Sequence, residues 1–344
     1  MKRIVMAICV CLTVLTLVGS AFAAELWDWH LRGADEGVAA GALPPPGAYF
    51  VNDFYWAPSW KLYGNDGHLN LNVAGPGTEA KLAAFVDIPV LVWVPGLNIL
   101  GASYGAAIAQ PFDFASLRVV NANTGSTLAS GQQWGAYNTV FDPIILSWDI
   151  PYNFHVSAAF QVGFNDGTSS VGESKASATQ LYSDKLLSKS GTNAYAWSSN
   201  NAYTFTPVIG LSWLYNGWNV SAEFMYTFWT KDNSADIQNG DQFGADYTVT
   251  YSWNRWIFGL GAAQENQVYN DKGNVALQSG ALSYGKILNS ENVNYSMGPI
   301  IGYNFGPCSL MFTYNFALKT KNDVGGDWAM LRLVVPLGNP SSWY

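Results

Sequence analysis

Three segments of this chain alternate between apolar and polar side chains. In Trp218–Trp229 every second residue is apolar, and polar residues such as Glu223 and Thr227 lie between them. Phe243–Trp253 and Cys308–Lys319 follow the same pattern. Successive side chains of a β-strand point to opposite faces, so each segment has one apolar face and one polar face. Aromatic-rich segments of this kind, separated by turns, are typical of a transmembrane β-barrel.

The connections between such segments alternate in length. Short turns such as Asn216-Gly217 and Asn254-Arg255 alternate with longer polar segments, of which 166–201 is the longest. Outer-membrane barrels combine short periplasmic turns with long external loops, and Asn-Gly favours a two-residue hairpin. A soluble β-sandwich, the alternative fold, gives no reason for this alternation. We therefore expect an all-β fold, a transmembrane antiparallel β-barrel of about twelve strands with short periplasmic turns and long extracellular loops.

The expected strands follow from the same pattern. They lie near 49–60, 78–93, 101–118, 135–148, 153–165, 202–215, 218–229, 242–253, 256–269, 292–305, 308–319 and 327–337. The long loop at 166–201 is either solvated surface or an external lid or entrance.

The first residues have the features of an export signal. Lys2 and Arg3 precede an apolar run, and Ala21-Phe22-Ala23 matches a cleavage site. We expect a cleaved signal peptide at 1–23, an irregular N-terminal lead at 24–47 and an outer-membrane barrel at 48–344. The lead ends in three prolines, which cannot donate to a strand ladder, so we place it outside the sheet. Whether it plugs the lumen stays open.

Composition excludes several classes of protein. Charged residues make up only 12% of the chain, aromatic residues 15%, and the net charge is −8. A chain so poor in charge suits a membrane, and its acidic balance argues against nucleic acid as a partner. After removal of the signal peptide, one cysteine, Cys308, and three scattered histidines remain. We therefore expect no metal site and no cofactor.

The polar faces of the strands should line the lumen. A charge that faces lipid at the midplane costs about 2–4 kcal/mol, so inward placement is favoured. These side chains either pair with one another to fill the interior or take part in solute passage. The lumen-lining candidates are Lys81, Asp87, His155, Gln161, Glu223, Asp246, Glu265 and Arg332.

Two other sets of residues lie at expected strand positions. Small inward residues such as Gly210 and Gly261 could leave room for a solute, relieve strand curvature or receive the N-terminal lead. Tryptophans near strand ends are expected to be membrane anchors rather than a carbohydrate platform. They are Trp56, Trp60, Trp93, Trp134, Trp148, Trp213, Trp218, Trp229, Trp253, Trp256 and Trp328.

One pair of residues suggests an enzyme. His155 and Ser157 share a strand face, which resembles the His-x-Ser pair of outer-membrane lipid A deacylases. Those enzymes need the pair at the lipid side, whereas here it shares a face with Gln161, opposite phenylalanines. No catalytic residues are therefore assigned, and we expect that the protein is not an enzyme.

Ordered stretches of the chain also resemble a known family. They are 41–49, 217–222, 239–243, 297–303 and 322–327. These stretches are similar to the outer-membrane family named for the meta-pathway of phenol degradation, also called SphA-like. The resemblance implies a β-barrel proposed to admit aromatic or other hydrophobic compounds, and it brings no catalytic residues.

The function expected from the sequence is therefore an outer-membrane channel that passively admits small hydrophobic or aromatic compounds. The alternative is a structural or surface-interaction barrel without transport, and the third hypothesis is a lipid-acting hydrolase that uses His155 and Ser157. Expected partners are outer-membrane lipid, lipopolysaccharide, a small hydrophobic or aromatic solute and the barrel assembly machinery.

Overall fold

The computed structural model describes residues 29–73, 75–168, 202–232, 237–276, 282–286 and 290–338. The predicted signal peptide and most of the 166–201 loop lie outside these residues. The described residues form no helix that is long and apolar enough to cross a membrane.

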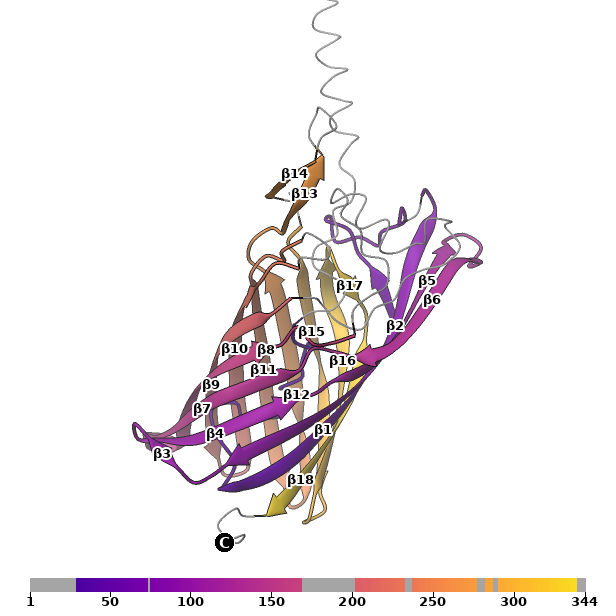
Figure 1. The fold of residues 1–344 in the computed structure, drawn as a ribbon. Helices are drawn as coiled ribbons and strands as arrows, with labels where there is room; N and C mark the ends of the chain where they lie inside the picture. The colour runs from indigo at the N-terminus through magenta and orange to yellow at the C-terminus, as the bar shows by residue number, and fades with distance from the viewer. Residues whose placement is uncertain are drawn as a thin grey trace, which may run out of the picture.

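Twelve long strands form a closed antiparallel barrel (Figure 1). They are β1 (Gly47–Leu62), β2 (Thr78–Val94), β4 (Ala102–Ala109), β7 (Val140–Ile150), β8 (Phe154–Gly163), β9 (Thr204–Tyr215), β10 (Trp218–Trp229), β11 (Gln242–Trp253), β12 (Trp256–Gln267), β15 (Val293–Asn304), β16 (Ser309–Lys321) and β18 (Trp328–Gly338). The barrel closes at β1, whose Asn52 is opposite Leu333 of β18 on one side and Pro89 of β2 on the other. The predicted fold class is confirmed.

Two expected strands are interrupted in the structure. The segment expected at 101–118 is divided into β4 and β5 (Phe112–Asn121), and both parts pair with β2 in one continuous register. The break falls at Pro111, which has no N–H to donate. The segment expected at 135–148 is divided in the same way into β6 (Thr127–Ala136) and β7. The β5–β6 hairpin leans away from the barrel above this break (Figure 1).

The remaining elements are short. They are β3 (Asn98–Ile99), the 3₁₀ turn η1 (Pro151–Asn153), β13 (Lys272–Ala276), β14 (Leu282–Lys286) and β17 (Val324–Gly325). The β13–β14 hairpin stands above the external rim (Figure 1). At the opposite end, Asn216 and Gly217 have φ of 47° and 86°, as the expected two-residue hairpin requires.

The outer face of the barrel is apolar. Val249 of β11 and Phe258 and Leu260 of β12 are among its exposed residues. Trp253 and Trp256 are exposed beside a periplasmic turn, as membrane anchors would be.

For three tryptophans the prediction of a membrane anchor is wrong. Trp60, Trp229 and Trp328 are buried on the inner side of the wall, where Trp328 stacks on Tyr55 at a centroid distance of 4.9 Å. These rings fill the external half of the interior.

A charge placed on the outer face tests this orientation. Val249→Arg should lower the free energy of unfolding by about 2–4 kcal/mol, because Val249 faces lipid near the middle of β11. Val249→Leu is the control and should be nearly neutral. Urea titration of protein folded into lipid vesicles measures both, and equal stability of the two variants would show that this face does not contact lipid.

Candidate functional site

The residues that precede β1 run through the interior of the barrel. We call residues 29–46 the lumen segment. At its start, Trp29 packs against Val208, Met225 and Trp229 in the external half of β9 and β10. At its end, Gly47 begins β1 at the periplasmic rim. The structure therefore answers the question that the sequence left open, because this part of the N-terminal lead occupies the lumen.

Hydroxyl groups of the strands hold the backbone of the lumen segment. Thr248 of β11 accepts a hydrogen bond from the Gly37 amide at 2.8 Å, and Ser212 of β9 accepts one from the Gly41 amide at 2.8 Å. Ser147 of β7 donates to the Gly41 carbonyl at 2.8 Å. An irregular segment has no ladder of its own, so these side chains satisfy its buried polar groups.

The wall leaves room for this close approach. A Cβ at Gly210 would collide with the carbonyl of Ala40, and a Cβ at Gly261 would collide with the carboxylate of Glu36. Of the roles considered for these small residues, reception of the N-terminal lead is the one that the structure shows.

Two arginines connect the lumen segment to the wall. Arg32 donates to Glu265 at 3.1 Å and to Asp323 at 2.9 Å. Arg332 of β18 binds Asp53 of β1 at 2.7 and 2.8 Å, and it also donates to backbone carbonyls of the lumen segment. All five of these charged residues are buried, so the removal of one partner would leave the other uncompensated.

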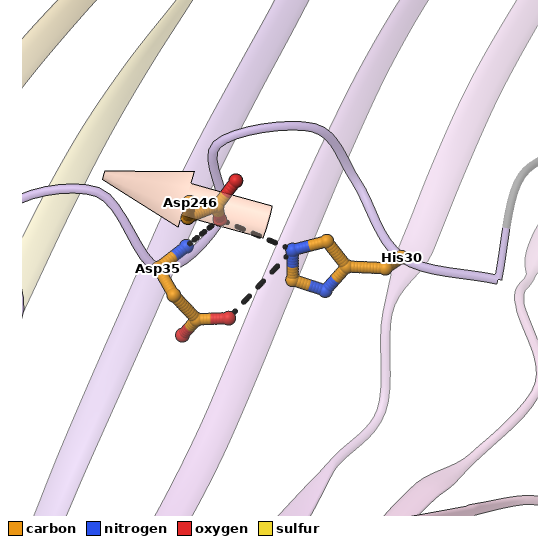
Figure 2. A group of neighbouring side chains, drawn as sticks. All are labelled: His30, Asp35 and Asp246. Carbon is orange, nitrogen blue, oxygen red and sulfur yellow. Dashed lines mark hydrogen bonds and ion pairs between the residues drawn. The ribbon is translucent and has the colours of Figure 1, made fainter. Parts of the chain in front are cut away.

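Asp246 of β11 is a further anchor (Figure 2). Its carboxylate accepts the amide N–H of Gly33 at 3.1 Å and of Asp35 at 2.9 Å, and it lies 3.2 Å from His30 Nε2. Asp35 Oδ2 lies 3.7 Å from the same nitrogen. These three side chains are the group among the described residues that could hold a metal ion. The hydrogen bonds of Asp246 already account for its place as an anchor of the lumen segment.

A cavity of about 680 Å³ lies between the lumen segment and the wall. It extends from Tyr137, at the break between β6 and β7, to Gly306 and Pro336 near the periplasmic end. One side is apolar, and its lining includes Val86, Ile88, Val90, Ala107, Ala109 and Ile145. The volume and lining are those of a site for a small organic molecule.

The eight lumen-lining candidates fall into different environments. Gln161, Glu223 and Arg332 line the cavity. Asp246 and Glu265 contact the lumen segment instead. His155 lies on the inner face of β8 and pairs with Asp149 at 2.7 Å near the periplasmic end.

Lys81 and Asp87 face outward, and their expected placement is corrected. Val86 and Ile88 of β2 line the cavity, so the residues that alternate with them lie on the opposite face. Lys81 pairs there with Glu79 at 3.0 Å, and Asp87 accepts a hydrogen bond from Asn52 at 2.6 Å. On the outer side Lys81 therefore has an oppositely charged partner, and the Asp87 carboxylate has a hydrogen-bond donor.

Several functional residues were not found from the sequence. Asp35 of the lumen segment, Asp53 of β1 and Asp142 of β7 all line the cavity. In β7 the alternation of inward and outward side chains is interrupted by a register shift between Phe141 and Ile144. Asp35 lies outside any strand, so no periodic signal applies to it.

A closed antiparallel barrel with an apolar outer face and an internal cavity is an outer-membrane β-barrel. The chain belongs to the family described as "Putative MetA-pathway of phenol degradation", whose model matches residues 61–179 and 189–333. This confirms the resemblance seen in the sequence. No curated protein sequence matches the chain.

Solved structures of outer-membrane proteins are similar to this chain to different degrees. The COG4313 outer membrane channel from Pseudomonas putida F1 is similar with a TM-score of 0.58 and 14% identity, over 89% of this chain and 99% of that chain. The translocator domain of the autotransporter NalP from Neisseria meningitidis has a TM-score of 0.47 and 10% identity, over 86% and 91% of the two chains. The Pseudomonas putida toluene transporter TodX has a TM-score of 0.36 and 10% identity, over 92% and 95%.

The anchoring of the lumen segment can be tested by its effect on ion flow. Asp246→Ala should raise single-channel conductance in planar bilayers, because the amides of Gly33 and Asp35 lose their acceptor, at about 1–3 kcal/mol each. Asp149→Ala, which removes a carboxylate outside the lumen segment's contacts, should leave conductance close to that of the unaltered protein. Unchanged conductance in Asp246→Ala would show that Asp246 does not hold the segment in place.

Proposed function

We propose that this protein is a passive outer-membrane channel for small hydrophobic or aromatic compounds. The observation that carries the proposal is the internal cavity of about 680 Å³, one side of which is lined by valine, isoleucine and alanine side chains. An apolar solute transferred from water to such a wall gains about 25 cal/mol for each Å² of apolar surface that is buried. The family description and the similar outer membrane channel support this proposal.

Passage of a solute through the channel needs no energy source. The cavity reaches residues near the periplasmic turn, including Gly306 and Cys308, so a solute in it lies close to the periplasmic end. A solute that is consumed inside the cell would move down its own gradient.

A second candidate is a structural or surface-interaction barrel without transport. The dense anchoring of the lumen segment by Arg32, Asp246 and Arg332 favours it, because a permanently filled lumen would pass nothing. The two candidates differ in whether the cavity conducts a solute.

The proposal includes no enzymatic reaction. The Ser157 hydroxyl donates to the carbonyl of Ala40 at 2.8 Å, and Ser157 lines the cavity rather than the lipid side. A lipid-acting hydrolase would need its nucleophile on the outer face, where the acyl ester lies.

The expected partners follow from the same proposal. The apolar outer face suits outer-membrane lipid, and the external rim would lie against lipopolysaccharide. Insertion would require the barrel assembly machinery, because the backbone groups of membrane strands are all paired only after the barrel has closed.

A substitution that fills the cavity tests transport. Ala107→Trp should strongly reduce uptake of a labelled neutral aromatic such as toluene into proteoliposomes, because Ala107 lines the cavity. Ile108→Trp is the matched control, since Ile108 is the next residue on β4 and faces outward.

Equal uptake by Ala107→Trp and Ile108→Trp would show that the cavity is not the route. Absence of uptake by the unaltered protein, above empty liposomes, would favour the structural barrel instead.

A further inference from the structure

We propose that the cavity prefers apolar solutes that carry a positive charge, such as aryl or alkyl ammonium ions, over neutral or anionic solutes of the same shape. This inference rests on the proposed function, because it names the solute class of the same cavity. It follows from the difference between the two sides of the cavity.

The apolar side is formed by β2, β4 and neighbouring parts of β1 and β7. Val86, Ile88 and Val90 of β2 face the cavity together with Ala107 and Ala109 of β4. A hydrated metal ion gains nothing from such a wall, whereas an organic group buries apolar surface against it. The ligand must therefore contain a hydrocarbon part.

The other side carries an excess of carboxylates. The acidic residues that line the cavity are Asp35, Asp53, Asp113, Asp142 and Glu223, and the basic ones are His30 and Arg332. Arg332 is already bound bidentately by Asp53, and His30 lies between Asp35 and Asp246. These contacts leave Asp142 and Glu223 without a cation of their own among the residues that line the cavity.

Glu223 lies beside a second acidic residue. Glu223 of β10 lies directly opposite Asp246 of β11, and like charges at opposite positions destabilise a strand pair. On its other side Glu223 lies opposite Gly210 of β9, which the backbone of Ala40 covers, so no positive charge lies at that position. The carboxylate therefore lines the cavity beside a second negative charge, which an ammonium group would offset.

Asp142 extends the negative side across β7. It lines the cavity with Gln161 of β8, which donates a hydrogen bond to it, and it lies within electrostatic range of Asp35 and Glu223. A cationic solute that lies along the apolar wall would thus have carboxylates from β7 and β10 beside it. An organic anion would be repelled by the same groups.

The test compares three probes of similar shape on the purified full chain in lipid nanodiscs. They are benzyltrimethylammonium, the neutral neopentylbenzene and the anion benzylsulfonate. We expect the cation to bind at least about tenfold more tightly than the neutral probe, the size of one partly screened ion pair, and the anion to bind most weakly.

Isosteric variants assign the effect to the cavity. Asp142→Asn with Glu223→Gln should reduce the affinity for the cation about tenfold and change that for the neutral probe less than about twofold. Asp87→Asn is the matched control, because Asp87 lies on the outer face, and it should change neither affinity.

The outcomes separate this inference from the proposed function. Equal affinity for the cationic and neutral probes would overturn the inference and leave the channel proposal standing. Binding of none of the probes, together with no uptake of a neutral aromatic, would overturn both. The comparison of the three probes uses the unaltered protein, so it tests the inference even if the double variant fails to fold.

Discussion

The constraint on which this structure depends is that no backbone polar group in a bilayer can be left without a partner. Each unsatisfied group costs several kcal/mol in hydrocarbon, so a strand that crosses the membrane must be paired on both sides. β1 meets this requirement by pairing with β18 and β2 at once, which closes the ring of strands. Closure in turn creates an interior that is separated from lipid, and only there can the irregular lumen segment and its charged anchors lie.

The strands could be predicted because their signal is local. Period-two alternation in Trp218–Trp229 and the Asn216-Gly217 turn are readable without knowledge of the rest of the chain. The inner and outer faces of β2 could not be distinguished in this way, since Val86 and Ile88 on one face and Phe85 and Leu91 on the other are all apolar. Only closure of the barrel decides which of these faces contacts lipid. Lys81 and Asp87 lie on the face that closure turns outward.

The candidate site was predictable only in part, for a related reason. Gln161 and Glu223 lie at polar positions of regular strands, so alternation alone places them inside. Asp35 and the pairing of Arg32 with Glu265 depend on a segment without periodicity, which is ordered by contacts with strands more than 200 residues away. The register shift in β7 hides Asp142 in the same manner.

The lumen segment has a consequence for how the barrel is assembled. Because Gly47 connects it directly to β1, the strand that completes the ring also carries the segment into the interior. The hydroxyls of Ser147, Ser212 and Thr248 come from β7, β9 and β11, so one stretch of chain bridges alternate strands from within. The segment therefore links strands that do not pair with each other, in addition to the pairing of each strand with its neighbours in the wall.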